Sequence, residues 1–106
     1  MQKTETLGQF EQLVLAAVRM IDKAYAVPIH EHVERLYKRS VKIASIYTTV
    51  DRLEAKGYIK SRPPEPTSKP GNKPKQYYSI TRTGEKALQD SAETAMRFLE
   101  SLRARG

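Results

Sequence analysis

Apolar residues recur every three or four positions in four stretches of the chain, and this period predicts four helices. The first covers about residues 7–21, where Thr6 and Gln9 have the spacing of a capping box. Pro28 suits the first turn of the second helix, because its missing N–H would have no partner there. The apolar stripes are Phe10, Leu13, Val14, Ala17 and Met20 or Ile21 in the first, and Ile29, Val33 and Leu36 or Tyr37 in the second.

The third predicted helix, about residues 44–56, has two chemically different sides. Gly57 should end it in a left-handed conformation. Tyr47 flanks the apolar stripe, so we expect it to pack on the core. The stripe consists of Ile43, Ile46, Val50 and Leu53; with about 100° per residue, the opposite side carries Ser45, Thr48, Arg52 and Lys56, with Thr49 at its margin.

Two short segments, residues 58–62 and 76–80, alternate like half-buried strands. Tyr77 and Tyr78 should therefore face opposite sides of the second strand. Residues 63–74 between them include five prolines and one glycine, which predicts a loop. The two strands and the loop predict a β-hairpin.

The last predicted helix, about residues 82–104, carries a regular apolar seam. Thr81 should cap it, although Gly84 stands where an acid would complete the capping box. Met96 and Phe98 widen the seam. Its members are spaced by 4, 3, 4 and 3 residues, a heptad pattern that predicts a helical dimer interface: Leu88, Ala92, Ala95, Leu99 and Leu102.

These elements predict a mainly α protein with a small β-hairpin, a winged helix-turn-helix followed by a C-terminal dimerisation helix. Residues 1–81 would form the DNA-binding domain and residues 82–106 the dimerisation helix, packed as one compact unit. The length of 106 residues suits one domain. No cysteine is present, which excludes disulfides and thiolate metal sites. No signal peptide is indicated, and no apolar stretch reaches the ~20 residues of a membrane span, so we expect a cytoplasmic protein.

The net charge of +7 is concentrated in the middle of the chain. From Arg35 to Arg82 there are twelve Lys or Arg residues and only three acids, whereas the remaining residues are slightly acidic. A basic segment around a helix and a hairpin is typical of a nucleic-acid surface. The alternative is a solvated face that only keeps the protein soluble.

The third helix is the candidate for entering the major groove of double-stranded DNA. Arg52 is the best candidate for a bidentate contact with guanine, and the hairpin lysines would contact phosphates. Ordinary surface positions are the alternative for each of them. The candidate DNA-binding residues are Lys42, Ser45, Thr48, Thr49, Arg52, Lys56, Lys69, Lys73 and Lys75.

No catalytic arrangement, metal site or cofactor site is predicted, so we expect a protein that is not an enzyme. His30 and His32 lie two positions apart on a helix and point away from each other, so they cannot share a metal. Asp51 and Glu54 are the only acids on the third helix, and we expect them to pair with neighbouring cations such as Arg52 or Lys56.

Four segments resemble the PadR family of bacterial transcriptional regulators, in its short form with one helix after the hairpin. They are LGQFE at residues 7–11 with LVL at 13–15, AYAVPI at 24–29, SIYTTVDRLEAKGYI at 45–59 and KQYYSITRTG at 75–84. Many family members have glycine where this chain has Ala26. The resemblance implies a homodimer formed by the C-terminal and first helices, which represses a promoter by binding an inverted repeat.

The resemblance also implies an effector, because family members often release DNA when a small aromatic or drug-like molecule binds at or near the dimer interface. Met96 and Phe98 are the candidate lining residues, with core or interface packing as the alternative. Two other functions remain open. A winged helix can serve as a protein-interaction module without DNA readout, and RNA or non-specific nucleic-acid binding would need exposed stacking aromatics.

Overall fold

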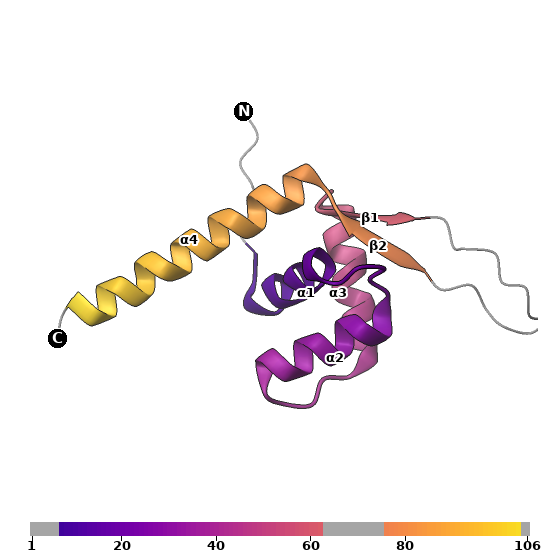
Figure 1. The fold of residues 1–106 in the computed structure, drawn as a ribbon, viewed down its shortest axis with the longest axis horizontal. Helices are drawn as coiled ribbons and strands as arrows, with labels where there is room; N and C mark the ends of the chain where they lie inside the picture. The colour runs from indigo at the N-terminus through magenta and orange to yellow at the C-terminus, as the bar shows by residue number, and fades with distance from the viewer. Residues whose placement is uncertain (1–6, 63–75, 105–106) are drawn as a thin grey trace, which may run out of the picture.

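The computed structural model describes residues 7–62 and 76–104 and confirms the predicted fold class. Four helices and one hairpin follow each other in the predicted order (Figure 1). They are α1 (Gln9–Met20), α2 (Ala26–Tyr37), α3 (Ile43–Ala55), β1 (Ile59–Arg62), β2 (Tyr77–Ile80) and α4 (Arg82–Ala104).

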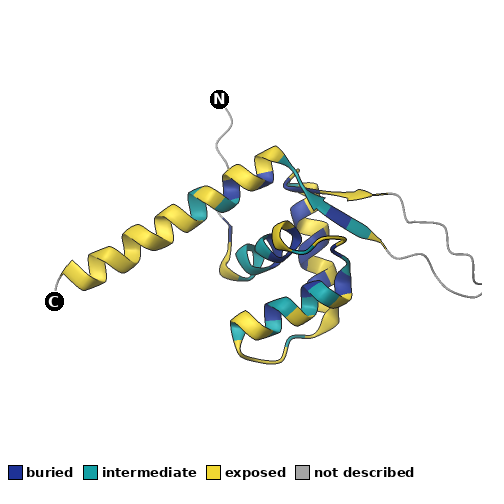
Figure 2. Ribbon diagram, in the orientation of Figure 1, coloured by how far each residue is buried: buried dark blue, intermediate teal, exposed yellow. Residues whose placement is uncertain are grey.

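The core lies where α1, α2 and α3 pack on one another and on the base of the hairpin (Figure 2). Its largest fully buried side chains come from all of these elements: Val14, Leu15, Ile29, Val33, Ile46, Val50, Leu53 and Ile59. Three residues that we expected in the apolar stripes, Met20, Leu36 and Ile43, are exposed. They stand at or next to helix ends, where no neighbouring element covers them.

The ends of α1 and α3 are closed by local hydrogen bonds. Gly8, not Thr6, is the N-cap of α1, and the Gly8 N–H donates to Glu11 Oε1 at 2.9 Å. Thr6 lies outside the described residues. At the other end, Gly57 has φ +80°, and the Gly57 and Tyr58 amides donate to the Glu54 and Leu53 carbonyls, each at 2.9 Å. This Schellman motif confirms the predicted end of the third helix.

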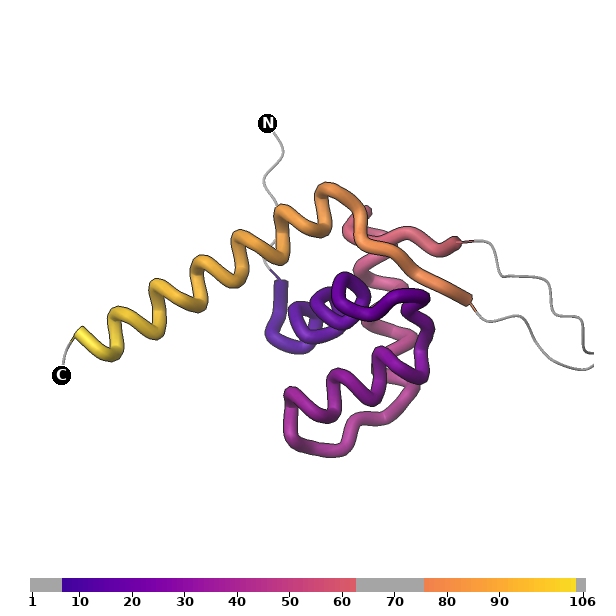
Figure 3. Tube along the Cα trace, viewed as in Figure 1, coloured from indigo at the N-terminus to yellow at the C-terminus, as the bar shows by residue number. Residues whose placement is uncertain are grey.

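The hairpin is antiparallel, with Ile59 opposite Ile80 and Arg62 opposite Tyr77. Tyr78 is buried, and its backbone N–H donates to the Ala24 carbonyl at 2.9 Å. Tyr77 is half-buried and lies edge-on to the ring of Tyr25. The two tyrosines therefore face opposite sides, as predicted. The Cα trace shows the hairpin and α4 leaving the helical body in opposite directions (Figure 3).

α4 begins against the hairpin and then leaves the core. Thr81 Oγ1 accepts a hydrogen bond from the Gly84 N–H at 3.0 Å, which confirms the predicted cap. A Cβ on Gly84 would stand 2.0 Å from the Tyr58 carbonyl oxygen, so this close approach explains why no acid completes the capping box. Ala87 is buried, whereas every residue of α4 from Ala92 onward is exposed (Figure 2). None of the described helices could cross a membrane.

Candidate nucleic-acid interface

The outer face of α3 is turned relative to the predicted one. Its buried side comprises Ile46, Thr49, Val50 and Leu53. Thr49 is only 5% exposed, so it lies on the core side and not at the margin of the outer face. Tyr47 is 51% exposed, and the prediction that it packs on the core is wrong. Because Thr49 takes part in the core, the helix presents Tyr47 to solvent instead.

Three of the predicted contact residues, Ser45, Thr48 and Arg52, are exposed on this outer face. The Thr48 hydroxyl donates to the Ala44 carbonyl at 3.0 Å, and its oxygen can still accept a hydrogen bond. Ser45, Thr48 and Arg52 also line a hollow of about 340 Å³ between α3 and Phe10 of α1. Side chains of hydroxylic and guanidinium type thus border a recess beside an exposed helix.

Lys56 differs from these residues because it is held by α1. Lys56 Nζ lies 2.9 Å from Glu11 Oε2, and the two side chains are 22% and 13% exposed. Burial alone would raise the pKa of Glu11. The Gly8 N–H, the Lys56 ammonium and the charge of Arg52 outweigh burial and lower that pKa below its ordinary value. Glu11 therefore stays ionised and links α1 to the C-terminal end of α3.

Glu54, one of the two acids of α3, has a partner that the sequence analysis did not name. Glu54 Oε2 accepts hydrogen bonds from the Ser61 N–H, at 3.2 Å, and from the Ser61 hydroxyl. Glu54 therefore fastens α3 to β1. Asp51 is exposed. Burial, together with the charges of Asp51 and Glu54, raises the pKa of Tyr78.

The remaining basic candidates flank α3. Lys42 is exposed as the N-cap residue of α3, while Lys69, Lys73 and Lys75 lie outside the described residues. Arg39, which the sequence analysis did not single out, lies 4.5 Å from the centre of the Tyr37 ring. Tyr37 in turn packs edge-on against Phe10. No periodic pattern identifies Arg39, because it lies in the turn before α3.

The predicted seam of α4 lies on an uncovered surface. Leu88 is half-buried, and the other seam residues are exposed in the single chain: Ala92, Ala95, Leu99 and Leu102. Met96 and Phe98 are exposed as well, with 61% and 65% of their surface accessible. Large apolar side chains thus continue along α4 far beyond the core.

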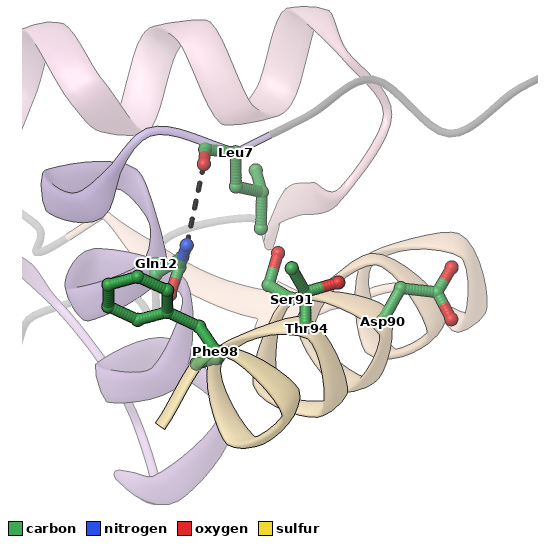
Figure 4. A pocket seen from close by; sticks show the side chains of 7 residues that line it. Leu7, Gln12, Asp90, Ser91, Thr94 and Phe98 are labelled. Atoms are coloured by element: carbon green, nitrogen blue, oxygen red, sulfur yellow. Dashed lines mark hydrogen bonds between the residues drawn. The ribbon is translucent and has the colours of Figure 1, made fainter. Parts of the chain in front are cut away.

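A pocket of about 350 Å³ lies between the start of α1 and the middle of α4 (Figure 4). Gln12 Nε2 donates to the Leu7 carbonyl at 3.4 Å on its α1 side. Phe98 lines this pocket, but Met96 does not. The lining combines apolar, hydroxyl, amide and carboxylate groups: Leu7, Gln12, Asp90, Ser91, Thr94, Ala95 and Phe98.

The two histidines of α2 have separate surroundings. His30 Nε2 lies 2.6 Å from the Val41 carbonyl oxygen, whereas His32 Nε2 is buried without a hydrogen-bond partner among the described residues. Within residues 7–62 and 76–104, no three His, Cys, Asp or Glu side chains lie close enough to hold a metal ion.

Known proteins share this architecture. A PadR-like transcription factor from Bacteroides fragilis superimposes with a TM-score of 0.75 at 19% identity, over 93% of this chain and 91% of the other. A PadR family regulator from Clostridium difficile superimposes with a TM-score of 0.67 at 23% identity, over 92% of this chain and 97% of the other. BpsR of Bordetella bronchiseptica, whose DNA binding is regulated by 6-hydroxynicotinic acid, gives 0.67 at 17% identity, over 91% and 64%. No match was found among curated proteins.

At these identities the solved structures establish the fold, and the sequence family establishes the class of protein. The PadR-like model matches residues 14–90, which include α2, α3, the hairpin and the first part of α4. Its members are transcriptional regulators and not enzymes, in agreement with the sequence analysis. The chain therefore belongs to the transcriptional regulator PadR-like family.

Proposed function

We propose that this protein is a sequence-specific repressor that binds an inverted-repeat promoter site as a homodimer. The observation that carries the proposal is the outer face of α3, where Ser45, Thr48 and Arg52 are exposed beside a hollow. A helix fits the major groove of B-DNA, and these side chains can bond base edges or phosphates. The basic segment around α3 supplies the electrostatic attraction that DNA binding needs.

The residues of this surface have different roles in the proposal. Arg52 reads a guanine with two hydrogen bonds, as arginine does in major-groove recognition. Ser45 and Thr48 contact neighbouring base edges or phosphates. The cations Lys42, Lys69, Lys73 and Lys75 contact phosphates, which adds affinity without sequence information. Lys56 reaches DNA only if it leaves Glu11, and Thr49 only if it leaves the core.

The dimer would be built on α4. Leu99 and Leu102 are 46% and 58% exposed in the single chain, so burial in the dimer would contribute roughly half of the about 1.5–3 kcal/mol of a full leucine burial for each. Two copies of α4 packed by the heptad pattern would place two α3 helices on one DNA duplex, and the twofold axis would match an inverted repeat. In this scheme residues 1–81 bind DNA and residues 82–106 hold the dimer together.

The pocket between α1 and α4 is the proposed effector site. Phe98 offers an aromatic face, and Gln12, Ser91 and Thr94 offer polar groups that would orient a small planar molecule. BpsR supports a small-molecule effector, since its DNA binding is regulated by 6-hydroxynicotinic acid. Met96 does not line this pocket, so of the two predicted effector residues Phe98 carries this proposal.

Fluorescence anisotropy tests the proposal with the DNA upstream of the protein's own gene and a scrambled duplex, at two salt concentrations. Tight binding to the upstream DNA alone, surviving moderate salt, is the expected result. Equal and steeply salt-sensitive binding to both duplexes would reveal phosphate contacts only and contradict the proposed specificity. No binding to either duplex at low salt would favour a protein-interaction module.

A further inference from the structure

The first turn of α3 is not held by a cap of its own. Lys42, its N-cap residue, makes no side-chain capping bond, and no acidic residue lies in the first turn. A helix start is usually held by a Ser, Thr, Asp or Asn side chain that accepts a bond from an N–H group of the first turn. The start of α3 therefore lacks a cap bond from Lys42, and the residue before Lys42 makes hydrogen bonds that can hold it.

Two side chains of α2 bind both backbone polar groups of Val41. The Val41 N–H donates to Glu34 Oε2 at 2.8 Å, and His30 Nε2 lies 2.6 Å from the Val41 carbonyl oxygen. Because a carbonyl oxygen can only accept, Nε2 carries the hydrogen and donates. His30 and Glu34 stand one helical turn apart, with 3.4 Å between Nε2 and Oε2. The three residues form a single unit, which we call the Val41 clamp.

The Val41 clamp is partly shielded from water. The side chains of His30 and Glu34 are 23% and 35% exposed, and the Val41 side chain packs against the hydrophobic core. Hydrogen bonds in such surroundings compete less with water than surface bonds do. Val41 precedes the N-cap of α3 by one residue, so the clamp joins the start of this helix directly to α2.

We propose that His30 and Glu34 are positioning residues that determine sequence specificity without touching DNA. The inference rests on the proposed function, because it assumes that α3 reads base edges. A bidentate contact with a base needs donor–acceptor distances near 3 Å, so a small shift of α3 breaks it. Phosphate attraction tolerates such a shift. Loss of the clamp should therefore weaken specific binding and leave non-specific binding almost unchanged.

Paired substitutions distinguish loss of the hydrogen bonds to Val41 from the other effects of replacing a side chain. Glu34→Gln keeps an oxygen that can accept from the Val41 N–H, whereas Glu34→Leu removes it. His30→Gln places an amide nitrogen as many bonds from Cα as Nε2, whereas the amide of His30→Asn is one bond too short. Glu31→Leu is the charge control for Glu34→Leu, since Glu31 is an exposed acid on the same helix.

Each variant is measured against a duplex that the wild type selects from a random pool and against a scrambled duplex. Glu34→Leu and His30→Asn should lose about tenfold in affinity for the selected duplex, as expected when one partly buried hydrogen bond is lost. For the scrambled duplex, the affinity of Glu34→Leu should stay within about twofold of that of Glu31→Leu, and the affinity of His30→Asn within about twofold of that of His30→Gln. The two Gln variants should recover most of the loss.

Amide hydrogen exchange supplies a second readout on the free protein. Loss of the clamp should speed exchange at Val41 and in the first turn of α3, but not around Leu53. Should Glu34→Leu unfold the domain, the pair His30→Gln and His30→Asn decides, and equal specificity in both would overturn the inference. Equal losses on both duplexes would overturn it too. A wild type that does not distinguish the duplexes would instead contradict the proposed function.

Discussion

The Glu11–Lys56 ion pair joins two elements that are far apart in sequence, and its removal should destabilise the domain. Glu11→Gln keeps the size and shape of the side chain but removes its charge. The Lys56 ammonium, only 22% exposed, would then lose the negative charge that lies 2.9 Å from it. Exposed pairs contribute about 0.2–1 kcal/mol, and breaking a fully buried pair costs about 3–5 kcal/mol. The Glu11 and Lys56 side chains are 13% and 22% exposed, which lies between these two cases. We therefore expect Glu11→Gln to lower the free energy of unfolding by about 1–3 kcal/mol.

The effect of Glu11→Gln should depend on pH in a defined direction. The pKa of Glu11 is lower in the folded protein than its ordinary value of 4.5. A group whose pKa is lower in the folded protein than in the unfolded chain stabilises the fold at pH values above its unfolded-state pKa. This stabilisation is lost as the pH falls through its folded-state pKa. The difference in free energy of unfolding between the wild type and Glu11→Gln should therefore be largest at neutral pH and decrease below about pH 4.5.

Urea denaturation at a series of pH values, at one fixed protein concentration, measures both effects. The matched control is Asp90→Asn, which neutralises an acid in the exposed pair Lys86–Asp90, where Nζ and Oδ2 are 3.4 Å apart. The control should lose no more than about 0.5 kcal/mol, the upper end for exposed pairs of this spacing on a helix. If Glu11→Gln loses no more than the control, or if its effect grows on acidification, the reasoning is refuted.

Three further predictions concern DNA binding, assembly and the start of α4. Arg52→Ala should weaken binding to the selected duplex by roughly 1–3 kcal/mol in anisotropy titrations; unchanged affinity would show that the recognition face is misassigned. Leu99→Asp should dissociate the proposed dimer, because it puts a charge into the apolar seam; an unchanged mass by light scattering at the same concentration would contradict this. Gly84→Ala should lower the thermal midpoint, because its Cβ would stand 2.0 Å from the Tyr58 carbonyl oxygen; a midpoint equal to that of the wild type would refute the close approach.

Sequence periodicity was enough to predict the elements and their order. Helical spacing of apolar residues, the left-handed stop at Gly57 and the cap at Thr81 depend on neighbours within about one turn of the chain, so local chemistry decides them. The alternation of Tyr77 and Tyr78 is equally local, because successive side chains of a strand face opposite sides. The fold class followed from these elements, and the predicted residues Ser45, Thr48 and Arg52 all proved exposed.

The orientation of α3 was decided by tertiary packing. Thr49 is polar and Tyr47 is large and partly apolar, so a hydrophobicity pattern assigned the tyrosine to the core and left the threonine at the margin. In the folded domain the neighbours of α3 cover Thr49 and leave Tyr47 outside. The local pattern defines an apolar stripe, but only the packed neighbours decide how far the helix turns around it.

The sequence also does not predict which partners the polar side chains choose. Glu11 meets Lys56 across 45 positions, Glu54 turns to Ser61 of the hairpin, and Gly84 makes room for the Tyr58 carbonyl. A charged side chain has many acceptable partners, and sequence spacing ranks only those on its own helix. The choice among distant partners depends on how α1, α3 and the hairpin approach one another, and only the tertiary structure defines that approach.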